Sequence, residues 1–200
     1  MNILLATTFF GPVQWYQKLY RADGVVVDAA ESFRKQSFRN RCYIAAANGV
    51  QALTVPVEKA RLTRDVRISD HGEWRRVHWN AIQSAYGESP FLEYYQDDLR
   101  PFFEKRWDYL LDFNEAICQT VCSLLDIHPR WLSSQEASDL TANEGRMDYR
   151  EAINPKHPAD DPDFVPRPYY QVYASRYGFQ PNLSVLDLLL NMGPESIFYL

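Results

Sequence analysis

The feature that most constrains the fold of this chain is a continuous apolar run near its start, Ile-Leu-Leu-Ala-Thr-Thr-Phe-Phe at residues 3–10. A run of this length without alternation is typical of a strand buried on both faces, as in a parallel sheet. Gly11-Pro12 ends the run, and apolar residues then fall at helical spacing to about Ala22. A second strand is expected at residues 25–28, which hold three consecutive valines. The order strand, helix, strand predicts a βαβ unit with a parallel strand pair.

The rest of the chain adds a hairpin and several helices. Asn48-Gly49 lies between two apolar runs, which is the strongest short signal for a β-hairpin. Apolar residues at helical spacing predict helices from Trp74 to about Tyr86, from Ser89-Pro90 as N-cap and first turn, and from Trp107 to Leu125. A last helix is expected over residues 182–191, with Asn182 or Ser184 as its cap and Gly193 as the stop. We therefore expect one α/β domain over residues 1–200, a mixed, mostly parallel Rossmann-like sheet with a hairpin and a helical layer.

One segment departs from this pattern. Residues 138–167 are acidic, contain four prolines and hold few large aliphatic side chains. The stretch 156–163 is too rich in Pro and Asp for regular structure. Too little chain follows it to form another domain. We expect a surface loop or lid within a single domain.

Composition and charge narrow the class of function. The net charge is −5, and the first 80 residues carry 12 Lys and Arg against 7 Asp and Glu, while the rest carry 9 against 19. A nucleic-acid-binding protein usually has a high isoelectric point, whereas here it is about 5.4. No apolar stretch is long enough for a membrane span. The first residues form an expected strand and lack the basic start of a signal peptide, so we expect a cytoplasmic protein.

The three cysteines and four histidines show no metal-ligand spacing. Cys118 and Cys122 stand four apart on a predicted helix, as a reduced core pair, with a redox pair or soft-metal site as the alternative. The sequence lacks the dinucleotide-binding, phosphate-loop and serine-hydrolase signatures. The cofactor therefore stays unassigned.

The first candidate site is the basic loop, defined here as residues 33–41. Arg34, Lys35, Arg39 and Arg41 crowd four cations into eight residues, and the loop is too basic to belong to the core. Ligands of such folds gather beyond the carboxyl ends of the strands, where this loop falls. We expect Lys35, Arg39, Asn40 and Arg41 to bind a small anion. The alternative is a solvated loop whose charges pair with the acidic second half of the chain.

Other polar residues offer weaker signals. His71 is the candidate general base because it lies in a turn beside Asp70, which could orient it. Asn114 falls on the apolar stripe of its helix, so we expect it to bond a buried backbone group. Asp187, on the last helix, is expected to pair with an arginine.

Seven short segments carry a resemblance to a known family. They are Lys35-Gln-Ser-Phe-Arg-Asn-Arg41, Leu53-Thr-Val-Pro-Val57, Trp74-Arg-Arg-Val-His78, Ser89-Pro-Phe91, Asp112-Phe-Asn-Glu115, Tyr169-Tyr-Gln171 and Phe179-Gln-Pro-Asn-Leu-Ser184, the last of which continues through Asp187, Asn191, Gly193 and Glu195. In these segments and their order the chain resembles the WbqC-like family of bacterial proteins. Members usually begin with His-Gln-Pro, then a Pro-Trp-x-Gly helix start. Here Leu5-Ala6-Thr7 and Gly11-Pro12-Val13-Gln14 stand there, so the family histidine is missing.

The resemblance implies a function. The family is associated with surface polysaccharides, and glycine or aminoacyl transfer to a sugar is the activity implied. We therefore expect a transferase acting on an activated anionic small molecule, such as a nucleotide or sugar phosphate. Gln14 and Asn182, within the compared segments, complete the expected substrate-binding set. The alternative is a non-catalytic binding or accessory protein that kept the fold and lost the histidine.

Overall fold

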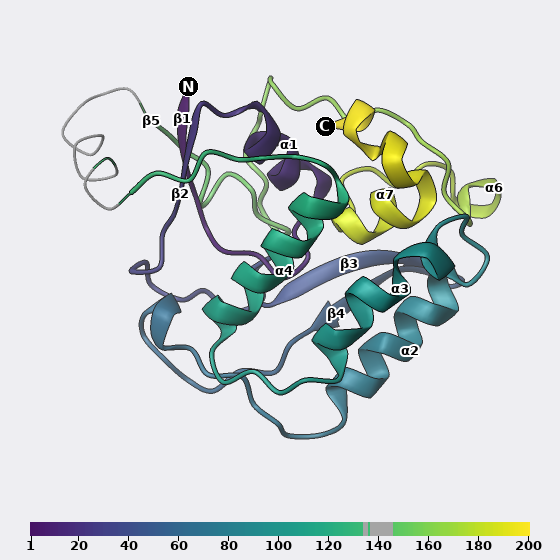
Figure 1. Ribbon diagram of the computed structural model, residues 1–200, viewed down its shortest axis with the longest axis horizontal. Coiled ribbons are helices and arrows are strands. Elements are labelled where there is room, and N and C mark those ends of the chain that lie inside the picture. Colours follow the sequence, from purple (N-terminus) through teal and green to yellow (C-terminus); the bar gives the residue numbers. More distant parts are fainter. Residues whose placement is uncertain (134–135, 137–145) are drawn as a thin grey trace.

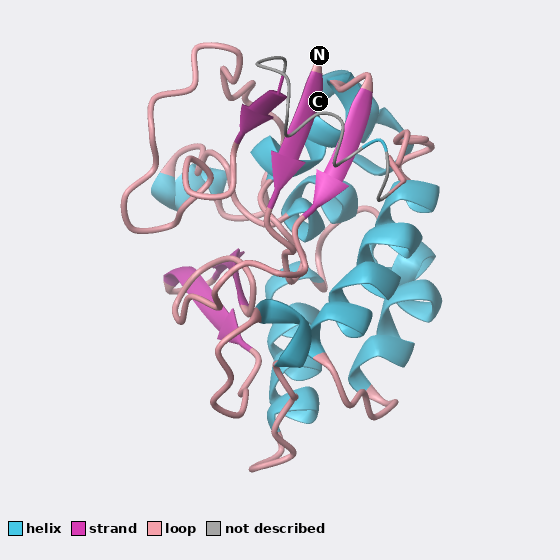
Figure 2. Ribbon diagram, turned by 90° about the vertical axis from the view of Figure 1, so that its left-hand side faces the viewer, coloured by secondary structure: helices cyan, strands magenta, loops and turns pink. Residues whose placement is uncertain are grey.

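The parallel sheet forms one end of the molecule (Figure 2). The computed structural model describes residues 1–133, 136 and 146–200. Three parallel strands pair in the order β2-β1-β5. Their bounds are Asn2–Leu5 for β1, Gly24–Val27 for β2 and Arg146–Asp148 for β5. Helix α1 (Val13–Arg21) joins β1 to β2, so the predicted βαβ unit is confirmed.

The apolar run at residues 3–10 is shorter as a strand than predicted. Strand β1 ends at Leu5, and the following residues turn into the core, with Phe10 at φ 40°. All residues from 3 to 19 are nevertheless buried, on the strand, in the turn and around α1. The apolar run therefore predicts that these residues are buried, but not that they form a strand, because a turn inside the core is buried as well.

The predicted hairpin at Asn48-Gly49 is confirmed. Strands β3 (Arg41–Ala46) and β4 (Gly49–Thr54) pair antiparallel, and Gly49 adopts φ 107°, which favours glycine. The hairpin forms a sheet of its own, separate from the parallel strands.

Helices lie mainly along one side of the molecule (Figures 1 and 2). The α-helices are α2 (Trp74–Tyr86), α3 (Leu92–Leu99), α4 (Leu110–Leu124), α6 (Ala174–Tyr177) and α7 (Val185–Met192). The 3-10 helices are η1 (Thr63–Asp65), η2 (Arg100–Phe103) and η3 (Gly193–Tyr199). Two predicted starts were wrong: Phe91, not Ser89, precedes α3, and α4 starts at Leu110, three residues after Trp107. Ser184 caps α7 by accepting from the Leu186 amide at 3.2 Å.

The acidic segment contributes to the fold more than predicted. Its residues 138–145 lie outside the described part of the chain, and residues 146–148 form β5 beside β1. The remainder is irregular and packs over α1, where Asp161 contacts the Lys18 ammonium at 2.7 Å. Both side chains are buried. We call residues 149–166 the strap.

Asp187 lies at the centre of the packing around α7, and its predicted arginine partner is wrong. The carboxylate accepts hydrogen bonds from the Tyr86 hydroxyl at 2.8 Å, the Tyr169 hydroxyl at 2.7 Å and the Gln171 amide at 2.7 Å. Asp187 is fully buried, and burial raises the pKa of this carboxyl, although the three donors oppose the rise. Neutral donors satisfy the carboxylate without the cost of burying a cation.

Two further predictions concern the core and the membrane. Cys118 and Cys122 are buried with their sulfur atoms 3.9 Å apart, so the reduced core pair is confirmed. Each helix within the described residues is too short or too polar to cross a bilayer. The fold class is the predicted one, an α/β domain with a parallel sheet, a hairpin and helices.

Candidate functional site

A cavity of about 360 Å³ lies between β2, α4 and the chain at Trp131-Leu132. Its position follows from the topology, because Thr7 and Thr8 come just after β1 and Ala29 just after β2. Ligands of parallel α/β sheets bind beyond the carboxyl ends of the strands. The volume is within the range of small-molecule sites, near its lower end. We call this space the edge cavity.

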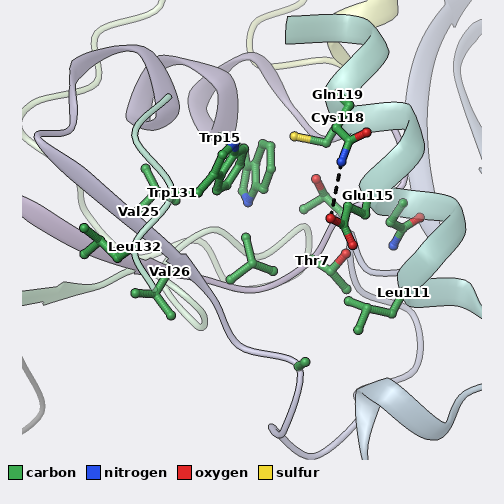
Figure 3. A pocket seen from close by; sticks show the side chains of 14 residues that line it. Thr7, Trp15, Val25, Val26, Leu111, Glu115, Cys118, Gln119, Trp131 and Leu132 are labelled. Carbon is green, nitrogen blue, oxygen red and sulfur yellow. Dashed lines mark hydrogen bonds between the residues drawn. The ribbon is translucent and has the colours of Figure 1, made fainter. Parts of the chain in front are cut away.

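The walls of the edge cavity are mostly apolar. Val25, Val26 and Val27 of β2, Leu111 of α4 and Leu132 all contribute to its lining. Figure 3 shows the rings of Trp15 and Trp131 among these walls. The Trp15 indole nitrogen donates to the Ala6 carbonyl at 3.0 Å, so this ring is fixed and its polar atom is already bonded.

Two buried polar side chains of the edge cavity have unused hydrogen-bonding atoms. Asn114 of α4 is 1% exposed, and its amide nitrogen donates to the Arg39 carbonyl at 2.8 Å, as predicted for a buried backbone partner. Its Oδ1 accepts no hydrogen bond from the described residues. Thr8 is 4% exposed, and its Oγ1 also has no partner there. Because unpaired buried polar atoms are rare and costly, these two point to a ligand or an ordered water.

A single charged side chain, Glu115, is among the described residues that line the edge cavity. Its Oε1 accepts a 3.3 Å hydrogen bond from the Gln119 amide, one turn further along α4. Both side chains extend from α4 toward the space in front of Trp15 in Figure 3. The site therefore has negative character.

The cavity thiol is not an activated nucleophile. Cys118 lines the cavity, and its sulfur contacts that of Cys122. This hydrogen bond, together with burial, raises the pKa of the Cys118 thiol well above its usual value. The thiolate is the reactive form, and it is disfavoured here.

The basic loop contacts the edge cavity through the hydrogen bond between Asn114 and the Arg39 carbonyl. Its polar side chains are mostly bonded to other parts of the protein. Arg39 is buried, unlike the prediction that the loop is too basic for the core, because it forms a bidentate ion pair with Glu31 at 2.6 Å. Asn40 donates to the Val55 carbonyl at 3.0 Å, and Arg41 donates to the Thr54 hydroxyl at 2.9 Å. Lys35 is exposed and makes no ion pair with the described residues.

Two other arginines near the carboxyl edge of the sheet, Arg34 and Arg150, are also paired. Arg34 contacts Glu151 at 2.7 Å, the pairing with the acidic half that the alternative expected. Arg150 joins the ends of two strands by contacting Asp148 of β5 at 2.6 Å and Asp28 just after β2. Arg34 and Arg150 thus carry their own counter-ions.

The remaining predicted site residues lie apart from the edge cavity lining. Gln14 donates to Asp161 at 2.7 Å and accepts from Asn182 at 3.1 Å, so both amides help to hold the strap on α1. Asp70 contacts Arg75 at 2.7 Å, which lowers the pKa of Asp70. His71 is exposed. Neither Asp70 nor His71 is among the residues that line the edge cavity.

Sequence reasoning missed Thr8, Glu115 and Trp131 as site residues. A signal for Thr8 was present, since Thr7-Thr8 interrupts the apolar run just where a strand end is due. Glu115 stands beside Asn114 in the motif Asp112-Phe-Asn-Glu115, but nothing local shows which helix face covers the sheet edge. In the described part of the chain, no group of three or more His, Cys, Asp or Glu could hold a metal.

Comparison with known proteins identifies the family of this chain. The model of the WbqC-like protein family matches residues 7–199. The chain belongs to the WbqC-like family. It is similar to a protein of Mycobacterium tuberculosis (strain ATCC 25618 / H37Rv) named "Uncharacterized protein Rv1507c", with 27% identity over 195 residues, 84% of this chain and 83% of that one. No solved structure matches this chain.

The family match includes the segments that form the edge cavity. Thr7 and Thr8, β2, α4 and Trp131 all fall within residues 7–199. The site described above is therefore part of the family domain of this WbqC-like protein.

Proposed function

We propose that this WbqC-like protein is a small-molecule transferase whose acceptor substrate binds in the edge cavity. The observation that supports this most is the cavity itself, at the carboxyl edge of the parallel sheet, with the unpaired polar atoms of Asn114 and Thr8 in its lining residues. A substrate that bonds these atoms would relieve the cost of leaving them unpaired.

The activated donor substrate is proposed to lie outside the cavity, with its anionic group near the basic loop. Lys35 supports this placement, because it is exposed while Arg34 and Arg39 are held by carboxylates. The transferred group is proposed to be glycine or another aminoacyl group, and the acceptor a sugar of surface-polysaccharide biosynthesis. This part of the proposal depends on the family resemblance.

A second candidate function is ligand binding without catalysis. The observation in its favour is chemical: the Cys118 thiol is disfavoured as a thiolate, and no histidine occurs among the described residues that line the cavity. A protein with this lining binds and orients a molecule but brings no activated nucleophile to it.

The binding proposal is tested by thermal unfolding with a panel of monosaccharides, amino sugars, nucleoside triphosphates and nucleotide sugars. A molecule that binds only the native state raises the melting temperature. Leu111→Trp fills the cavity and should abolish the shift, whereas Leu124→Trp, at a half-buried position of α4 outside the lining, should preserve it. A panel without any shift, or a shift that survives Leu111→Trp, would refute the proposed site.

The transfer proposal needs a separate readout. The compound that binds is incubated with a preformed glycyl-adenylate, and mass spectrometry follows the transfer of the glycyl group to that compound, with AMP as the leaving group. Product formation that falls about tenfold or more in Lys35→Ala, with unchanged stability, supports a donor anion near the basic loop. Binding without product supports the second candidate.

A further inference from the structure

Three side-chain oxygens of the residues that line the edge cavity can accept a hydrogen bond and receive none from the described residues. Asn114 uses its amide nitrogen on the Arg39 carbonyl, which leaves Oδ1 free. Glu115 receives one hydrogen bond at Oε1, and its Oε2 accepts none from the described residues. The Thr8 hydroxyl is free and can accept or donate. A ligand that satisfies this set must bring donors.

The charges around the cavity favour a positively charged ligand. Glu115 is the single charged group among its described lining residues. Arg39 and Arg150 do not cancel it, because Arg39 is paired with Glu31 and Arg150 with Asp28 and Asp148. An anion placed in the cavity would meet a carboxylate and, among the described residues that line it, no cation.

The aromatic walls add a third preference. Trp15 and Trp131 both line the cavity, and Trp131 is 46% exposed. The faces of indole rings attract ammonium groups, and their area covers an apolar ring. The valines of β2 and Leu111 extend this apolar surface. The lining thus fits a flat or ring-shaped body that carries a positive group.

We infer that the edge cavity selects a primary amine on a compact ring, with the ammonium directed at Glu115. This inference rests on the proposed function and specifies its acceptor as an amine-bearing molecule. It also separates the two substrates by charge: the amine binds inside the cavity, and the anion of the donor stays outside it.

The test uses three probes of one skeleton: 2-phenylethylamine, 2-phenylethanol and phenylacetate. Their binding to the full chain is followed by ligand-observed NMR titration. The amine should bind about tenfold more tightly than the alcohol, since a charge-assisted hydrogen bond replaces a neutral one. Phenylacetate should bind more weakly than both.

Two variants assign the selectivity to Glu115. Glu115→Gln removes the charge at an exposed position of α4 and should reduce the preference for the amine to less than about threefold. Asp112→Asn removes a charge from an exposed position of the same helix that does not line the cavity, and should leave the preference unchanged.

The outcomes separate this inference from the proposed function. Equal binding of amine and alcohol that Leu111→Trp abolishes overturns the amine selectivity and keeps the cavity as a ligand site. A preference for phenylacetate, or an amine preference that Glu115→Gln leaves intact, also overturns the inference. If none of the three probes binds while a panel compound occupies the cavity, the inference fails alone; if nothing binds there, both fail.

Discussion

The side-chain amide of Asn114 donates a 2.8 Å hydrogen bond to the carbonyl oxygen of Arg39, 75 residues earlier in the chain. This contact joins α4, which forms one wall of the edge cavity, to the basic loop. It also decides which atom of Asn114 is left for a ligand. One side chain thus makes a structural hydrogen bond and belongs to the proposed ligand site.

Asn114→Ala should lower the free energy of unfolding by about 1–3 kcal/mol, because the buried Arg39 carbonyl loses its side-chain donor. Urea unfolding measures the change. Asn80→Ala, at an exposed position of α2, is the control and should stay within about 0.5 kcal/mol of the wild type. Equal effects of the two variants would show that the Asn114–Arg39 hydrogen bond contributes nothing measurable to the free energy of unfolding.

Two arginines of the basic loop should behave differently when replaced by alanine. Arg39→Ala leaves Glu31 buried without its partner and should cost about 3–5 kcal/mol. Arg34→Ala breaks an exposed pair with Glu151 and should cost about 0–1 kcal/mol. Chemical denaturation of both variants makes the comparison. A small effect at Arg39 would mean that water replaces the ion pair.

Local patterns were sufficient for the elements that depend on neighbours in sequence. The valines of β2, the turn at Asn48-Gly49 and the cap at Ser184 each follow from a few adjacent residues. Asn114 could also be placed, because a polar residue on an apolar helix stripe needs a buried partner.

Long-range pairing escaped the same reasoning. Strand β5 has three residues, Arg-Met-Asp, without β-branched side chains, and its place in the sheet comes from pairing with β1 more than 140 residues away. The sequence predicts Arg39 at the surface, whereas the structure buries it in an ion pair with Glu31 at 2.6 Å. The edge cavity draws on segments from Thr7 to Leu132, so its lining depends on packing that no short motif encodes.

Asp187 should make stability fall as pH rises from acid. Burial raises the pKa of this carboxyl in the folded state above its unfolded value of about 3.9, so the native state holds the proton more tightly. Between these two pKa values the native chain binds more protons than the unfolded chain, and deprotonation costs stability. Asp187→Asn should remove this component, seen as the difference between the two pH profiles of the unfolding free energy. Parallel profiles for wild type and variant would contradict it.

His78 should act in the opposite direction. Burial among Trp74, Phe9 and Phe103 lowers the pKa of this imidazole to about 4, against about 6.5 when unfolded. The unfolded chain binds the extra proton between these values, so stability is complete above about pH 6.5 and is lost toward pH 4, by an amount of the order of 3 kcal/mol.

The variant for this prediction is His78→Phe, which keeps the ring and removes the titration. The His78 Nδ1 has no partner among the described residues, so its loss should cost little at pH 7.5. Melting temperatures at pH 4.5 and 7.5 should differ less in this variant than in wild type. His128→Gln, at an exposed position, should leave the wild-type difference unchanged, and the same difference in all three proteins would exclude His78 as the source.

The strap should be released from α1 when Asp161 loses its charge. The Asp161 carboxylate accepts hydrogen bonds from Lys18 at 2.9 Å and Gln14 at 2.7 Å. Burial opposes ionisation of Asp161, but these donors outweigh it and lower the pKa of the carboxyl. Asp161→Asn leaves the buried Lys18 ammonium without a counter-ion, at a cost of about 3–5 kcal/mol.

Limited trypsinolysis reads out this release, because Lys156 is an exposed cleavage site in the strap while Arg167 precedes a proline and resists trypsin. Cleavage after Lys156 should be at least about tenfold faster in Asp161→Asn, since local opening needs less free energy. Asp160→Asn alters the adjacent, exposed carboxylate and should cleave at the wild-type rate. If both variants are cut equally fast, the Lys18–Asp161 pair adds nothing to the free energy of local opening of the strap. The strap is then held by its backbone hydrogen bonds and apolar contacts.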